Sequence, residues 1–127
     1  MKMKYYAKLI SLSEDVEEEA VFSLGEYNIC CFVNYSPIKL DIGSIYLIEL
    51  GLIFFDDELI EHSNESECFL KRKGNSFKYE MNGYLFENNF ILSNLVFQDD
   101  LFYDYSYLEN KFVNLQADRI TVSIIEI

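Results

Sequence analysis

The stretch Ile-Tyr-Leu-Ile-Glu-Leu-Gly-Leu-Ile-Phe-Phe, residues 45–55, is the longest apolar run of the chain and carries its strongest strand signal. Alternate side chains of an extended chain lie on opposite faces. One apolar face of this run therefore carries Tyr46, Ile48, Leu50, Leu52 and Phe54. Gly51 within so long a strand predicts a bulge or a sharp bend, as at the corner of a barrel.

The residues before this run predict three more strands. Lys4–Leu12 alternates between two faces, and Ala20–Tyr35 carries two strand-like runs on either side of Gly25-Glu26. The second run is almost continuously apolar, which is typical of a strand covered on both faces. The acidic segment Ser13–Glu19 fits either a solvated loop or a short helical turn capped by Ser13.

The clearest local signal after residue 55 is a hairpin. Phe77–Met81 alternates, Asn82-Gly83 follows, and Tyr84–Phe86 continues the run. Asn-Gly between alternating runs supplies the two positive φ angles of a type I′ turn. We therefore expect the chain to reverse at Asn82-Gly83.

The remaining segments are weaker. Cys68–Lys71, Phe90–Phe97 and Arg119–Ile127 are strand candidates, the last with clean alternation. Asp56–Glu67 is polar and predicts an exposed loop or edge, and Leu101–Leu108 fits no single pattern. With about seven or eight strands and at most one short helix, we expect an all-β, mainly antiparallel fold, a small barrel or compact sandwich. The 127 residues are expected to form a single domain, 1–127.

A resemblance rests on the order of several segments, namely Asn28–Asn34, the turn at Pro37, Asp41–Leu50, Tyr107–Val113 and Asp118–Val122. In this order the chain resembles small bacterial OB-like barrel proteins of unassigned function. The resemblance implies a small barrel. OB-like barrels usually bind oligonucleotides or sugars with aromatic side chains on an open face.

The chain is strongly acidic, with 22 acidic against 10 basic residues and a net charge of −12. Such a charge repels nucleic-acid backbones and anionic membranes, and it speeds encounter with a basic protein. Solubility alone is an alternative reason for the acidity. In size and acidity the chain also resembles bacterial immunity proteins, cytoplasmic inhibitors that neutralise basic toxin domains, and this implies a basic protein partner.

The acidic residues gather in three segments, and the third mixes them with tyrosines. Tyrosine offers a large rigid contact area and a hydroxyl, so it suits a protein interface. Tyr103, Tyr105 and Tyr107 would share one face if their segment were extended. The candidate partner-binding residues are Glu17, Glu18, Glu19, Asp56, Asp57, Glu58, Asp99, Asp100, Tyr103, Asp104 and Tyr105.

No residue pattern indicates catalysis, a metal or a cofactor. The single histidine, His62, lies in a polar segment, and no serine or cysteine stands in a nucleophile motif. Cys30 and Cys31 alternate across a strand, so they are expected to be buried structural residues, whereas Cys68 is more accessible. Three cysteines without an export signal or a spanning helix favour the reducing cytoplasm.

The sequence thus predicts a non-enzymatic binding protein, an inhibitor of a basic toxin or effector domain, as a monomer or small homo-oligomer. One alternative is an OB-like module for an oligonucleotide or oligosaccharide, with a groove lined by the chain's basic cluster, Lys71, Arg72, Lys73 and Lys78. Another alternative is a structural subunit that oligomerises through an exposed strand edge.

Overall fold

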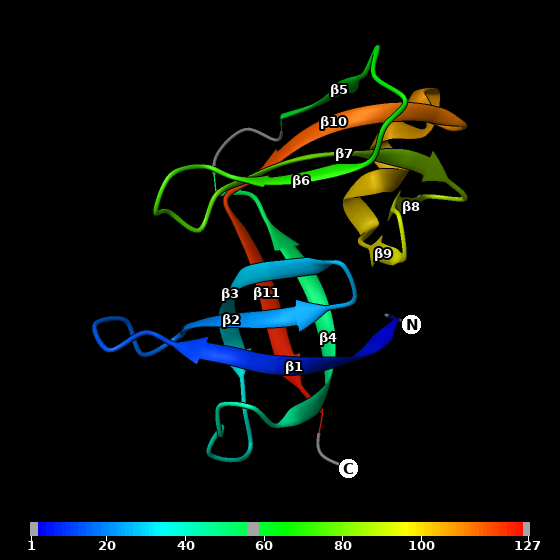
Figure 1. Cartoon of the computed structure of the whole chain (residues 1–127). Coiled ribbons are helices and arrows are strands. Elements are labelled where there is room, and N and C mark those ends of the chain that lie inside the picture. The colour runs from blue at the N-terminus through cyan, green and yellow to red at the C-terminus, as the bar shows by residue number, and fades with distance from the viewer. Residues whose placement is uncertain (1–2, 56–58, 126–127) are drawn as a thin grey trace.

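The computed structural model describes residues 3–55 and 59–125. Within these ranges the chain forms eleven strands and one short 3₁₀ helix, arranged as a closed five-stranded barrel and a second, six-stranded sheet (Figure 1). The second sheet is built from the segment between the last two barrel strands in chain order. The all-β, mainly antiparallel fold expected from the sequence is therefore confirmed, but it contains more strands than the seven or eight expected.

The barrel closes in the strand order β1-β2-β3-β11-β4. All neighbouring strands are antiparallel except β3 and β11, which are parallel. The five strands lie close to the bounds predicted for them: β1 (Lys4–Leu12), β2 (Glu19–Leu24), β3 (Tyr27–Tyr35), β4 (Ile45–Ile53) and β11 (Arg119–Ile124).

Gly51 does not form the predicted bulge. It pairs with Thr121 in an uninterrupted register between β4 and β11. The register shifts lie elsewhere, between Leu9 and Ser11 in β1 and between Val122 and Ser123 in β11. In the acidic segment before β2, the Ser13 hydroxyl accepts hydrogen bonds from the backbone of the next turn, and no helix forms there.

The second sheet follows the order β5-β10-β7-β8-β9, and β6 also pairs with β7. The polar segment after Phe55 provides its edge strand β5. Lys71 and Arg72 of the predicted basic turn belong to β6, and the connection to β7 begins at Lys73. The strands are β5 (Leu59–His62), β6 (Phe69–Arg72), β7 (Tyr79–Phe86), β8 (Asn89–Leu92), β9 (Leu95–Gln98) and β10 (Lys111–Ala117).

The Asn82-Gly83 hairpin prediction is wrong, because both residues are buried in the middle of β7. The Asn82 side-chain amide donates to the backbone carbonyls of Glu65 and Glu67, at 3.1 and 2.8 Å. The chain reverses instead at Glu87-Asn88, whose φ angles are +52° and +61°. A buried amide with two acceptors outweighs the local turn preference of Asn-Gly.

Phe90–Phe97 is likewise two strands rather than one, joined by a tight turn at Ser93-Asn94 with Ser93 at φ +54°. The ambiguous segment that follows forms the 3₁₀ helix η1 (Asp100–Leu108), whose Phe102 and Leu108 are buried. The Phe102 ring stacks on Phe90 at 6.0 Å between centroids. This helix therefore covers the hydrophobic face of the second sheet.

One continuous cluster of buried side chains runs through both sheets. Two tyrosine hydroxyls join the sheets at specific points. The Tyr5 hydroxyl of β1 accepts the Val96 backbone N–H at 2.7 Å, and the Tyr79 hydroxyl of β7 accepts the Cys30 backbone N–H at 2.7 Å. The barrel therefore positions the second sheet through buried apolar contacts and polar bridges.

Candidate protein-binding site

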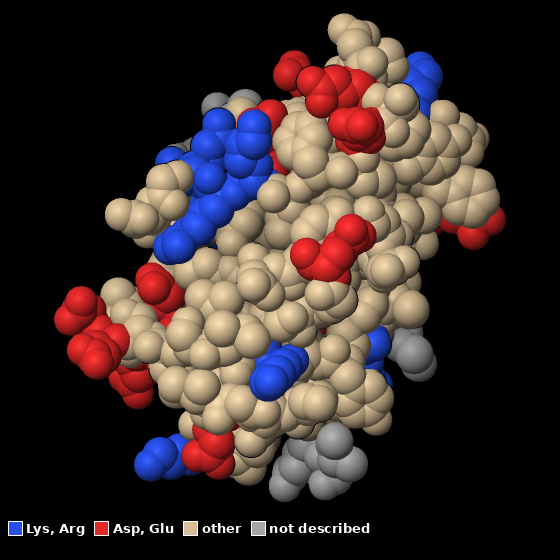
Figure 2. All heavy atoms as spheres, in the orientation of Figure 1, with Lys and Arg blue, Asp and Glu red and all other residues tan. Residues whose placement is uncertain are grey.

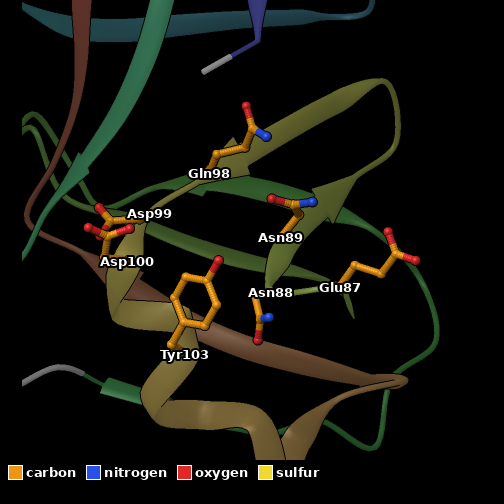
Figure 3. Close-up of a pocket in the computed structure, with 7 residues that line it drawn as sticks. All are labelled: Glu87, Asn88, Asn89, Gln98, Asp99, Asp100 and Tyr103. Atoms are coloured by element: carbon orange, nitrogen blue, oxygen red, sulfur yellow. The ribbon is translucent and has the colours of Figure 1, made fainter. Parts of the chain in front are cut away.

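An acidic cavity of about 420 Å³ opens on the second sheet, between the β7–β8 turn and the start of η1. Three carboxylates, three carboxamides and one phenol line it, and among the described residues no lysine or arginine does. Figure 3 shows the Tyr103 ring rising between the two aspartates on one side and the two asparagines on the other. The lining residues are Glu87, Asn88, Asn89, Gln98, Asp99, Asp100 and Tyr103.

Local backbone chemistry fixes both walls of the cavity. The left-handed turn at Glu87-Asn88 supplies one wall, and the Glu109 carboxylate at the end of η1 accepts the backbone N–H groups of both turn residues. Asp99 precedes η1 as its N-cap and accepts the Leu101 N–H at 3.0 Å. The carboxylate of Asp99 therefore holds the helix start, as Ser, Asp and Asn caps do.

The remaining polar groups of the cavity are available to a ligand. Asp100 and Glu87 are exposed. The Gln98 Oε1 atom is buried and accepts no hydrogen bond from any residue that the structure describes. Two carboxylates that make no ion pair within the described chain, together with an unsatisfied acceptor, suit a ligand that donates several N–H groups and carries positive charge.

One exposed aromatic ring lines this cavity, and two more lie on the elements that form its walls. Tyr103 is 64% exposed and Tyr107 is 67% exposed, and Phe86 beside the β7–β8 turn is 43% exposed. Tyr105 instead packs against the core, because the segment is helical and does not present all three tyrosines on one face. Asp104, on the same helix, is exposed.

The structure separates the predicted acidic segments rather than joining them. Asp99, Asp100 and Tyr103 meet in the acidic cavity, whereas Glu17 and Glu18 line a different groove of about 570 Å³ on the barrel. That groove also contains Val33, Ile38 and Leu40, and Glu19 lies half-buried at the start of β2. Figure 2 shows the carboxylates of one face in several separate groups. The predicted residues Asp56, Asp57 and Glu58 lie outside the described residues.

Sequence reasoning missed the half of the cavity that comes from the β7–β8 turn. Glu87, Asn88 and Asn89 carried a signal, since asparagine tolerates the left-handed conformation that tight hairpins require. Because Asn82-Gly83, five residues earlier, is the stronger turn signal, the prediction placed the turn there. Gln98 carried no signal of its own.

The thiols are placed as expected for structural cysteines. Cys30 and Cys31 are buried on opposite faces of β3, and Cys68 is half-buried. Burial raises the pKa of both Cys30 and Cys31, because the interior disfavours the thiolate. A thiol with a raised pKa is a poor nucleophile.

Within residues 3–55 and 59–125, no three His, Cys, Asp or Glu side chains come close enough together to hold a metal ion. None of the helices in those ranges has the length and apolar character needed to cross a membrane. His62 is exposed on the edge strand β5.

Comparison with known proteins assigns the chain to a family. No curated protein and no solved structure matches it. A family model matches residues 3–125, nearly the whole chain. The chain therefore belongs to the family described as Uncharacterised conserved protein UCP019853.

Proposed function

We propose that this protein binds a basic protein partner through the acidic cavity and the exposed rings around it. The observation that carries the proposal is the lining of the cavity, which contains Glu87, Asp99 and Asp100 and no lysine or arginine from the part of the chain that the structure describes. A lysine or arginine of the partner would enter the cavity and donate to these carboxylates. Tyr103 and Tyr107 would supply the apolar contact area around that anchor.

The net charge of −12 also supports a basic partner. A large net negative charge accelerates encounter with a basic molecule, and close charge pairs then slow dissociation. A protein with these properties can act as an inhibitor, because it covers the basic surface that its partner uses to hold a phosphate-rich substrate. We therefore propose an inhibitor of the immunity type, acting in the cytoplasm on a basic toxin or effector domain.

A site-specific cross-link tests the surface in the cells from which the protein comes. A photo-reactive phenylalanine analogue replaces Tyr103, and the matched control places it at Tyr6, which is 71% exposed on the barrel. We expect the Tyr103 position to capture a basic protein that the Tyr6 position does not. Equal capture at both positions, no capture at Tyr103, or capture of an acidic protein contradicts the proposal.

The captured partner then allows the charge term to be measured by titration calorimetry. The variant Glu87→Lys/Asp100→Lys leaves the helix cap Asp99 intact, and we expect it to weaken binding by at least about tenfold at low salt. The control Glu61→Lys/Glu65→Lys makes the same change in net charge at exposed positions elsewhere on the second sheet. If both variants lose affinity equally, long-range charge rather than the cavity recognises the partner.

A further inference from the structure

Half of the lysines and arginines of this acidic chain gather at the end of the second sheet that carries the β6–β7 hairpin. Figure 2 shows a blue patch near the place where the hairpin meets the barrel. Four of the five lie within eight residues of the sequence. The fifth, Arg119, contacts the ring of Phe77, which lies between β6 and β7. The five are Lys71, Arg72, Lys73, Lys78 and Arg119, out of 10 in the whole chain.

Two of the hairpin cations have polar partners, and a third lies over an aromatic ring. Arg72 donates to the backbone carbonyls of Asn75 and Ser76, at 3.0 and 2.8 Å, so it holds the turn. Lys73 lies 3.9 Å from Glu80. Lys71 and Lys78 are exposed and form no ion pair with any residue in the described part of the chain. The Lys71 ammonium lies 5.7 Å from the centroid of the Phe69 ring, a contact that leaves its N–H groups able to donate to a ligand, as those of Lys78 are.

Arg119, at the start of β11, is held by aromatic rings rather than by carboxylates. Its guanidinium lies 4.0 Å from the ring centroid of Phe32, 4.9 Å from that of Phe55 and 5.6 Å from that of Phe77. It has no hydrogen bond or ion pair to the residues described in the structure. Stacking fixes the plane of the guanidinium and leaves N–H donors at its rim. Phe55 is 60% exposed, so part of its ring is open to a second stacking partner.

From this arrangement we propose that Lys71, Lys78, Arg119 and Phe55, here named the cationic junction, bind single-stranded nucleic acid. The three cations meet phosphates, and a base stacks on Phe55. Proteins that bind single strands combine positive charge with exposed rings in this way, whereas a duplex keeps its bases inside. At physiological salt charges beyond about 8 Å are largely screened, so the net charge of −12 opposes this contact chiefly through nearby carboxylates. Two described ones are Asp118, which accepts the Phe55 N–H at 2.8 Å, and Glu80, which is paired opposite Lys71 and lies 3.9 Å from Lys73.

This site goes beyond the proposed inhibitor function and uses a different surface. The hairpin tip and the η1 helix lie at opposite ends of the second sheet (Figure 1). No residue of the cationic junction lines the acidic cavity. The two proposals can therefore fail independently.

Fluorescence anisotropy tests the proposal with labelled DNA and RNA strands of about 12 nucleotides, within the usual site sizes. We expect the wild-type protein to bind single strands at low salt, with a salt slope of about −2 from three phosphate contacts. The variant Lys71→Glu/Lys78→Glu should abolish binding. The control Lys4→Glu/Lys111→Glu makes the same charge change at exposed sites outside the junction and should keep the affinity within about twofold.

Phe55→Ala separates stacking from charge. Loss of one stacked base should weaken single-strand binding at least about fivefold. Inorganic phosphate and the duplex of the same sequence serve as competitors, and neither should displace the strand at equal phosphate concentration. Absence of wild-type binding at low salt, equal loss in the control variant, an unchanged affinity of Phe55→Ala, or duplex binding as tight as single-strand binding each overturns the proposal.

Discussion

The barrel and the second sheet differ in how they satisfy their strand edges. The barrel closes on itself, so each of its five strands has two neighbours. The second sheet is open, with β5 and β9 at its ends and β6 along part of β7. Unpaired edges invite aggregation unless they are covered or charged. The edge strand β9 is covered by the barrel through Tyr5, and β6 carries Lys71 and Arg72.

This difference explains where the candidate sites lie. A closed barrel offers few irregular positions, whereas an open sheet of short strands needs turns, caps and a covering helix. The acidic cavity is made from such parts, the β7–β8 turn and the cap of η1. The cationic junction lies where the β6–β7 hairpin meets the barrel. Under both proposals most of the recognition residues come from the inserted sheet and its connections, and the barrel adds Arg119 of β11 and Phe55 after β4.

The largest effect that distinguishes the two regions is expected at Gly83, inside β7. A Cβ added there would lie 2.5 Å from the Ile91 carbonyl oxygen and 2.9 Å from a ring carbon of Phe90. Gly83→Ala must therefore push β8 away, and we expect it to lower the free energy of unfolding by about 3 kcal/mol. Urea denaturation measures this loss, and hydrogen exchange shows whether β7 amides open before those of β11.

Gly74→Ala is the matched control for that experiment. Gly74 has φ +61° in the β6–β7 hairpin, but a Cβ there meets nothing within 4 Å. We expect a cost of about 1 kcal/mol from the left-handed backbone alone. Equal losses in the two variants would show that the β7–β8 contact at Gly83 is not close.

The second effect concerns the buried bridge between Tyr79 and Cys30. Tyr79→Phe leaves the Cys30 N–H without its acceptor, and we expect a loss of about 2 kcal/mol at neutral pH. Burial raises the pKa of Tyr79 to about 12. The folded protein therefore keeps this proton at pH values where the unfolded chain loses it, so the contribution is complete below about pH 10 and disappears as pH rises towards 12.

The pH profile provides the check on that prediction. In urea melts between pH 8 and about 12, the stability of the wild type should fall more steeply than that of Tyr79→Phe. The free energy of unfolding of the variant should still fall somewhat as pH rises, because burial also raises the pKa of Cys30 and Cys31. Parallel profiles for the two proteins would show that Tyr79 is not the group that titrates late.

The sequence predicted the barrel better than the second sheet for a physical reason. Each barrel strand is long, alternates or is continuously apolar, and is bounded by turn residues such as Gly25 and Gly43, which both have positive φ. In such segments the local pattern and the tertiary packing agree. The bounds of β1 coincide with the predicted Lys4–Leu12.

The second sheet contains conflicts between local preference and packing. Its turns fall at Glu87-Asn88 and Ser93-Asn94, and four of its strands are only four residues long. The strongest turn signal, Asn82-Gly83, is buried because its amide has acceptors on the loop before β6 and its glycine permits close approach of β8. Those contacts involve residues up to 17 positions away, so a local sequence pattern cannot predict them.

Only part of the acidic cavity was predicted, because the rest of its lining is brought together by long-range contacts. Asp99, Asp100 and Tyr103 are consecutive or one helical turn apart, so any fold keeps them together. Glu87 joins them only because β7, β8 and β9 fold as a meander. The sequence prediction placed the first turn of this meander at Asn82-Gly83 and had no turn within Phe90–Phe97. The distance between the acidic segments 17–19 and 99–104 likewise depends on the insertion of the second sheet, which composition does not reveal.

The smallest expected effect tests the contact that covers the edge strand β9. Tyr5→Phe removes the hydroxyl that accepts the Val96 N–H at 2.7 Å, across 91 residues of sequence. Because Val96 is only partly buried, water replaces part of the lost bond, and we expect a cost of about 1 kcal/mol. Hydrogen exchange of the Val96 amide should accelerate about fivefold, since opening of this edge becomes easier by that free energy. Tyr6→Phe, on the exposed face of the same strand, should change neither quantity. Unchanged exchange at Val96 in Tyr5→Phe would mean that apolar packing alone covers this edge, so that the barrel protects the open sheet by contact area and not by a specific bond.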